Sequence, residues 1–159
     1  MTNGQKTKQK ALFIAQLALA EELKLPVILH VRDAWEDFLE ITQNLKHKTP
    51  KGVIHCYTGD TKTAKKLVDL GFYIGFTGFV TFEQSKFEHI QKAVNVVPIG
   101  KLLIETDAPF LAPEPYRGKT NEPAYVVEVA NKIAQLKGVT LEEIAKATTK
   151  NTEKLFNIK

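Results

Sequence analysis

Short apolar runs alternate along the chain with longer stretches in which apolar residues recur every three or four positions. The short runs cover residues 26–31, 53–57, 72–76 and 101–106, and glycine, proline or a charged residue lies next to each. Mostly apolar runs of about four to eight residues are typical of strands that are buried on both faces. We therefore predict four strands at these positions.

The longer stretches have the periodicity of helices that bury one face. In residues 5–25, the apolar side chains of Leu12, Ala15, Leu19 and Leu23 form one helical stripe. Asp33 is placed to cap a second helix, and Asp60 or Thr61 opens a third. Helices after the first are expected over residues 33–45, 60–70, 83–94, 121–136 and 141–147.

Strands that are separated by helices predict a parallel sheet covered by those helices, so the fold class is α/β. With 159 residues and 43% hydrophobic content, the chain is expected to form a single domain over residues 1–159, built of four βα units. The carboxyl ends of parallel strands meet at one edge, where sites of α/β proteins lie.

Three of the predicted strands end in side chains that bind metals. His30 ends the first strand, His55 lies near the end of the second, and Asp107 follows the fourth. Two imidazoles and a carboxylate on one edge form a set that leaves positions of a divalent metal open for water and substrate. We expect these residues to be ligands, with Asp107 also steering the proton of the attacking water.

Side chains alternate between the two faces of a strand. Arg32 follows on the face of His30, and Tyr57 follows on that of His55, so both are candidate substrate contacts. Glu105 shares the face of Asp107 and is expected either to hold a ligand from behind or to lie lower on that face. Cys56 falls on the opposite face, where a buried core thiol is the expected role.

Composition and charge give little information about the partners of the protein or its compartment. The net charge is +4 with a sequence pI near 9.1, and the lysines are dispersed, which suits solvation better than a dedicated polyanion surface. A single cysteine fits a reducing compartment, and no apolar run is long enough to span a membrane. We therefore expect a cytoplasmic protein without membrane contact.

Several segments, in order and spacing, resemble the TatD family of metal-dependent deoxyribonucleases, and the resemblance covers nearly the whole chain. They include Pro26-Val27-Ile28-Leu29-His30-Val31-Arg32-Asp33-Ala34, Gly52-Val53-Ile54-His55-Cys56-Tyr57-Thr58-Gly59, Gly71-Phe72-Tyr73-Ile74-Gly75, Leu103-Ile104-Glu105-Thr106-Asp107-Ala108-Pro109-Phe110, Arg117-Gly118-Lys119 and Asn121-Glu122-Pro123.

This resemblance implies a (β/α)8 barrel of the metallo-dependent hydrolases that cleaves phosphodiester bonds in DNA, as single strands or at ends. By position, His30, His55 and Asp107 match family ligands for Mg, Mn or Zn. Arg117 and Lys119 lie in a loop at the same edge, where they are candidate phosphate contacts.

The chain departs from the family pattern at its start. It has neither the first-strand His-x-His pair nor the later glutamate ligand, so its four units correspond to the second half of the barrel. A half-barrel leaves the strands at 26–31 and 101–106 as open edges, and we expect it to form a homo-oligomer or to bind a first-half partner.

Two other functions remain open from the sequence. The scaffold could carry an amide or ester hydrolase, because a fold does not fix its substrate. Alternatively, the chain is a non-catalytic half-barrel that assembles with itself or with a partner and lacks the full metal centre.

Overall fold

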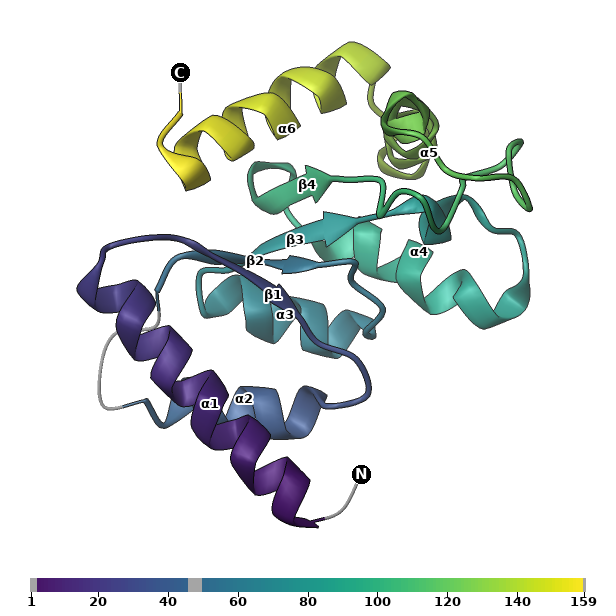
Figure 1. Ribbon diagram of the computed structural model, residues 1–159. Coiled ribbons are helices and arrows are strands. Elements are labelled where there is room, and N and C mark those ends of the chain that lie inside the picture. Colours follow the sequence, from purple (N-terminus) through teal and green to yellow (C-terminus); the bar gives the residue numbers. More distant parts are fainter. Residues whose placement is uncertain (1–2, 46–49, 159) are drawn as a thin grey trace.

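The structure is a computed structural model that describes residues 3–45 and 50–158. Its four strands form one parallel sheet in sequence order (Figure 1). The strands are β1 (Val27–His30), β2 (Gly52–His55), β3 (Tyr73–Phe76) and β4 (Leu102–Ile104). The parallel α/β fold and the positions of all four strands are confirmed, although each strand is shorter than its apolar run.

Six α-helices accompany the sheet in the described residues. They are α1 (Asn3–Glu22), α2 (Trp35–Gln43), α3 (Thr61–Asp69), α4 (Glu88–Val96), α5 (Val126–Lys137) and α6 (Leu141–Phe156). Short 3₁₀ turns cover Gly78–Thr81, Ser85–Phe87, Ile99–Lys101 and Pro123–Tyr125. The expected helices at 83–94 and 121–136 therefore each begin with a 3₁₀ turn, and the last helix runs nine residues beyond its predicted end.

The two predicted aspartate caps have different outcomes. Asp60 caps α3, because its Oδ1 accepts a hydrogen bond of 2.7 Å from the backbone N–H of Thr63. Asp33 does not cap α2. Its backbone has a left-handed φ of +53°, and the N-cap position falls on Ala34, which has no capping side chain.

The main core lies between one face of the sheet and the helices. Ile54, Ile74 and Leu102 are fully buried there against side chains of α3, α4 and α5. The other face, which carries His30 and His55, has a smaller cluster at the start of the strands. In it, Leu155 of α6 packs with Val53, Tyr73 and Leu103. The sheet is therefore packed by helices over one face and, at the start of its strands, by α6 on the other.

Helix α1 does not bury the stripe that its periodicity favours. Leu12, Leu19 and Leu23 are each more than half exposed, whereas Leu17 is buried. Ile28 of the edge strand β1 is also 65% exposed. In the described part of the chain nothing covers these apolar side chains, which, together with Leu25, we call the α1–β1 face. Ile28 lies on the His30 side of the sheet, and α1 packs on the other side.

The two edges of the sheet differ. Strand β4 has α6 beside it (Figure 1), and Nδ2 of Asn151 donates hydrogen bonds to the carbonyls of Ile99 and Leu102. Among residues 3–45 and 50–158, β1 pairs with β2 alone, in a register that sets His30 beside His55. None of the described helices is long and apolar enough to cross a membrane.

Candidate active site

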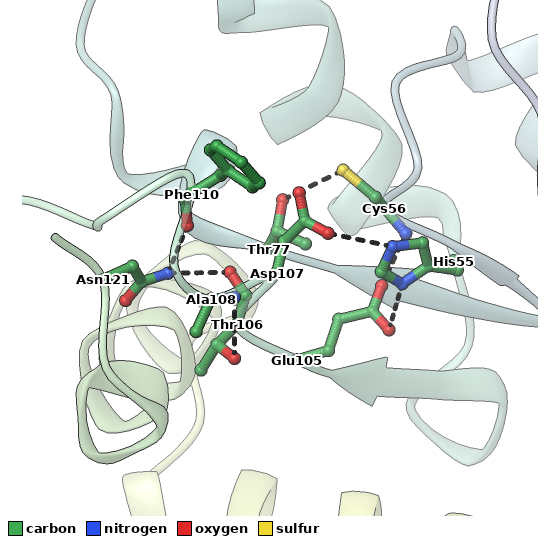
Figure 2. A network of polar contacts seen from close by, with 9 residues as sticks. All are labelled: His55, Cys56, Thr77, Glu105, Thr106, Asp107, Ala108, Phe110 and Asn121. Carbon is green, nitrogen blue, oxygen red and sulfur yellow. Dashed lines mark hydrogen bonds and ion pairs between the residues drawn. The ribbon is translucent and has the colours of Figure 1, made fainter.

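His55 lies between two carboxylates at the carboxyl end of β2. Its Nδ1 is 2.8 Å from Oε2 of Glu105, and its Nε2 is 3.2 Å from Oδ1 of Asp107 (Figure 2). All three side chains are partly buried. Each ring nitrogen therefore has its own carboxylate, and the imidazole cannot rotate without losing both contacts.

Glu105 reaches His55 across the intervening strand β3. In the strand register, Gly75 lies beside Leu103. Glu105 is two residues further on and shares the face of Leu103, and its side chain passes over Gly75. A Cβ built on Gly75 would lie only 2.6 Å from Oε1 of Glu105. The same carboxylate oxygen accepts a hydrogen bond of 2.5 Å from the backbone N–H of Cys56. The absence of a side chain at residue 75 thus makes the contact possible.

The two carboxylates affect the charge of the imidazole. The hydrogen bond to Glu105 raises the pKa of His55, partial burial opposes it, and the negative charges of Glu105 and Asp107 add to the rise. A carboxylate that holds one ring nitrogen of a histidine orients the other nitrogen and increases its basicity. Nε2 of His55 is therefore the nitrogen presented to a ligand.

The backbone turns sharply where the site residues leave the strands. Cys56 has a φ of +49° and Asp107 a φ of +65°, both in the left-handed region. This region is uncommon for residues other than glycine and occurs often at functional sites. The turn at Cys56 also resets the side-chain alternation after His55.

The prediction that Tyr57 shares a face with His55 is wrong for this reason. Tyr57 is 1% exposed, its ring packs against Trp35 and Phe76, and its hydroxyl donates to the carbonyl of Asp60 at 2.6 Å. Burial raises the pKa of Tyr57 well above its ordinary value. Because the phenol is buried and its hydroxyl is hydrogen-bonded, Tyr57 does not line the site and is not a substrate residue in this arrangement.

The prediction that Cys56 is a buried thiol is confirmed. Its Sγ lies 3.5 Å from Oγ1 of Thr77. Burial raises the pKa of the thiol to about 11. Since the thiolate is the nucleophilic form, Cys56 is a poor nucleophile.

His30 is the nearest of the other expected residues. Its ring centroid is 5.7 Å from that of His55, and the ring is exposed. Arg32 points to solvent, with only a distant pairing of 4.0 Å to Asp33. It shares the edge of the sheet with His30 without contacting the site.

Arg117 and Lys119 belong to the loop that follows the Asp107 segment. The guanidinium of Arg117 lies 4.2 Å from the ring centroid of Phe82 and 3.6 Å from Glu114. Lys119 lies 6.0 Å from the ring centroid of Tyr116. Within residues 3–45 and 50–158, no hydrogen bond or ion pair joins either cation to His55 or Asp107.

The donor types at this site suit a divalent metal, but the set is incomplete. An oriented imidazole nitrogen next to a carboxylate oxygen is a common pair of ligands. Among the described residues, however, no three His, Cys, Asp or Glu side chains are close enough to hold a metal ion. The residues that could hold a metal here are therefore the adjacent pair His55 and Asp107, with His30 on the neighbouring strand.

Gly75 and Asn121 lie in segments that resemble the family, but the sequence assigned neither of them a role in shaping the site. A glycine inside an apolar strand is a known sign of close approach by another group, so Gly75 could have been found. Asn121 is buried and donates from Nδ2 to the carbonyls of Thr106 and Phe110. No local pattern in the sequence indicates that contact.

A sequence profile of TatD-related DNases matches residues 1–157. The chain belongs to this family. It is 49% identical over 157 residues to the uncharacterized metal-dependent hydrolase YcfH of Escherichia coli K12, a match that covers 99% of this chain and 58% of the relative. It is 39% identical over 155 residues to a protein of Escherichia fergusonii named 3'-5' ssDNA/RNA exonuclease TatD, covering 95% and 59%.

Solved structures agree with this membership. The E. coli K12 TatD homologue YjjV superposes with a TM-score of 0.89 at 30% identity, over 100% of this chain and 61% of that one. An uncharacterized amidohydrolase from Saccharomyces cerevisiae, at 23% identity and a TM-score of 0.79, shares the fold. The chain thus spans about three fifths of the length of these TatD-family proteins.

Proposed function

We propose that this chain carries part of the active site of a metal-dependent phosphodiesterase that acts on DNA. The observation that supports the proposal best is the pair of contacts that fixes His55 between Glu105 and Asp107. Family membership supports hydrolysis with a divalent metal. The exonuclease name of one relative favours a single-stranded nucleic acid or a strand end as substrate.

Each residue of the group has a proposed role. His30, His55 and Asp107 are the ligands that this chain offers to Mg, Mn or Zn, and Glu105 orients His55. A bound divalent metal would lower the pKa of its water and polarise a phosphoryl oxygen. Asp107 is placed to accept the proton of the attacking water, since its carboxylate already lies beside the ligand nitrogen of His55.

Phosphate contacts are proposed for Arg32, Arg117 and Lys119. Guanidinium groups bind phosphate oxygens through two parallel hydrogen bonds, and lysine contributes a point charge. Arg32 is free to do so, because its side chain is 80% exposed. Arg117 and Lys119 would have to leave the rings of Phe82 and Tyr116.

We further propose that residues 1–159 form one domain equivalent to the second half of a (β/α)8 barrel. In the part of the chain that the structure describes, β1 pairs on one side only and the α1–β1 face is uncovered, and the relatives are longer. The remaining metal ligands would then come from the part of the family fold that residues 1–159 do not contain, and a separate first-half partner or a second copy is one way to supply them. The incomplete ligand set also favours the alternative of a non-catalytic half-barrel that assembles without forming a centre.

Cleavage of an end-labelled single-stranded oligodeoxynucleotide with Mg²⁺ or Mn²⁺ tests the catalytic proposal. We expect weak, metal-dependent cleavage by the chain alone, which His55→Ala and Asp107→Ala abolish. His89→Ala is the matched control, since the ring of His89 is exposed and hydrogen-bonds to the carbonyl of Thr58 and not to the site residues. A family first half supplied in trans should raise the rate by orders of magnitude, because it restores two-metal stabilisation.

Other outcomes distinguish the alternatives. Preferential hydrolysis of an amide or ester panel would replace the nuclease proposal with the second enzyme class. Metal content after dialysis should be about one ion per chain, and unchanged content in both His55→Ala and Asp107→Ala would contradict the ligand assignment. No cleavage and no bound metal, with or without the first half, would favour the non-catalytic half-barrel.

A further inference from the structure

Asn121 holds the loop that carries Asp107 at three points. Its side-chain Nδ2 donates to the carbonyl of Thr106 at 2.8 Å and to that of Phe110 at 2.6 Å (Figure 2). Its backbone N–H donates to the carbonyl of Pro109 at 3.0 Å. These acceptors lie on both sides of Asp107, so one buried side chain spans the loop.

The amide of Asn121 is oriented by these two donations. Its Oδ1 is buried and has no hydrogen-bond partner among the described residues. Rotating the amide by half a turn would set Oδ1 against two carbonyl oxygens, which also only accept hydrogen bonds. An unpaired buried acceptor is unfavourable, and it is tolerated here because Nδ2 satisfies two carbonyls at once.

The loop needs such support because Asp107 has a left-handed backbone. A non-glycine residue keeps this conformation only where its surroundings enforce it. The hydrogen bond from the Phe110 N–H to the Asp107 carbonyl, at 2.9 Å, closes the turn from within. Asn121, which lies outside this turn, holds it through the carbonyls of Thr106 and Phe110.

We propose that Asn121 is a positioning residue that sets the carboxylate of Asp107 against Nε2 of His55. The proposal rests on the proposed function, in which that carboxylate binds metal and accepts a proton. The hydrogen bonds of Asn121 go to main-chain carbonyls of the loop and not to Asp107 or His55. It acts by fixing the main chain on both sides of Asp107, and thereby the direction of the Asp107 side chain.

The chain contains a matched control at the opposite end of β4. Asn151 is also buried, and its Nδ2 also donates to two carbonyls, those of Ile99 at 2.8 Å and Leu102 at 2.9 Å. Asn151→Ala therefore removes two donated side-chain hydrogen bonds to main-chain carbonyls, as Asn121→Ala does. A merely structural role for Asn121 would make the two variants alike.

The experiment compares both alanine variants with the wild-type chain and with Asp107→Ala. Thermal unfolding reports stability, ¹⁵N NMR of the histidine ring at one fixed pH reports His55, and calorimetric titration with Mn²⁺ alone reports the ligand set. Asn121→Ser, whose shorter hydroxyl cannot span both carbonyls, replaces Asn121→Ala if the latter does not fold.

We expect both alanine variants to lose similar thermal stability. In Asn121→Ala, the Nε2 resonance of His55 should move toward its position in Asp107→Ala, while Nδ1, which faces Glu105, stays unchanged. The affinity for Mn²⁺ should fall at least tenfold, an effect of the size found for residues that orient metal ligands. Asn151→Ala should match the wild type in both measurements.

Two results would overturn the proposal. One is a folded Asn121 variant whose Nε2 resonance and Mn²⁺ affinity equal those of the wild type. The other is an equal disturbance of His55 by Asn151→Ala. Failure of the proposed function looks different, because wild-type chain would then bind no Mn²⁺, while the ring resonances of His55 would still decide whether Asn121 positions Asp107.

Discussion

Gly75 leaves the space through which the carboxylate of Glu105 reaches Nδ1 of His55. Gly75 lies in β3, and Glu105 directly follows the neighbouring strand β4. A methyl group at residue 75 would come within 2.6 Å of Oε1 of Glu105. Side chains larger than hydrogen would therefore block the path from β4 to β2. A glycine within a strand weakens the strand slightly. Here the missing side chain lets Glu105 contact His55.

We predict that Gly75→Ala displaces Glu105 from His55. The carboxylate is the end of a flexible side chain, so it should swing away while the strand persists. Loss of the Glu105 contact should lower the pKa of His55, since that hydrogen bond is the main cause of the rise. The affinity for Mn²⁺ should fall about 10- to 100-fold, as for other residues that support a metal ligand.

Histidine NMR titration and calorimetry with Mn²⁺ measure the two effects. Gly100→Ala is the control, because a Cβ at Gly100 would meet nothing within 4 Å. If Gly75→Ala left the titration of His55 unchanged, the contact seen between Glu105 and His55 would not exist in solution.

The sequence contained enough information for the sheet and for the edge that carries the site. Apolar runs and the residues beside them mark each strand, and parallel strands bring their carboxyl ends together whatever the details. That reasoning placed His55 and Asp107 on one edge, where they are in contact. It failed two residues after His55, at Tyr57, because the left-handed turn at Cys56 ended the alternation on which it relied.

Periodicity also cannot tell whether a stripe is covered. The spacing of Leu12, Leu19 and Leu23 identified a common helix face, yet these side chains lie exposed in the described structure. Local patterns report which residues share a face, and burial depends on what else is folded against it. Asn121 was missed for a related reason, since its two acceptors lie 15 and 11 residues away.

A second prediction concerns the cap of α3. Asp60→Ala should lower the free energy of unfolding by about 1 kcal/mol at neutral pH, because the backbone N–H of Thr63 loses its acceptor. Asp60→Asn keeps an acceptor and should cost less. Urea unfolding of the two variants and the wild type measures the difference.

The same cap should depend on pH. The backbone N–H of Thr63 lowers the pKa of Asp60 below its ordinary value, so the unfolded state takes up the proton first. The stabilisation by the carboxylate is then fully present above the unfolded pKa and is lost as the pH falls through the folded one. The advantage of wild type over Asp60→Asn should therefore shrink between about pH 5 and pH 2. An advantage that grew on acidification would contradict this assignment.

A third prediction concerns the thiol of Cys56. Because burial raises its pKa to about 11, iodoacetamide at pH 8 should label the folded chain at least about 100-fold more slowly than the chain unfolded in urea. Mass spectrometry over time measures both rates. Thr77→Val removes a hydroxyl contact that lowers the pKa of Cys56, so it should not speed labelling. Rapid labelling of folded wild type would show that Cys56 is open to solvent.

The last prediction concerns the α1–β1 face. Burying apolar surface is worth roughly 25 cal/mol per Å², and several large side chains on this face are at least half exposed, namely Leu12, Leu19, Leu23, Leu25 and Ile28. Association that covered them would offset its entropic cost, so we expect the wild-type chain to self-associate at micromolar concentration or to bind a first half. The double variant Leu19→Ser/Leu23→Ser should shift light scattering toward the mass of a single chain. Leu141→Ser, at an exposed residue of α6 away from this face, should not. The opposite result would be a wild-type chain that stays monomeric and unfolds cooperatively. The fold would then be stable with the α1–β1 face exposed to water, and the argument for assembly would fail.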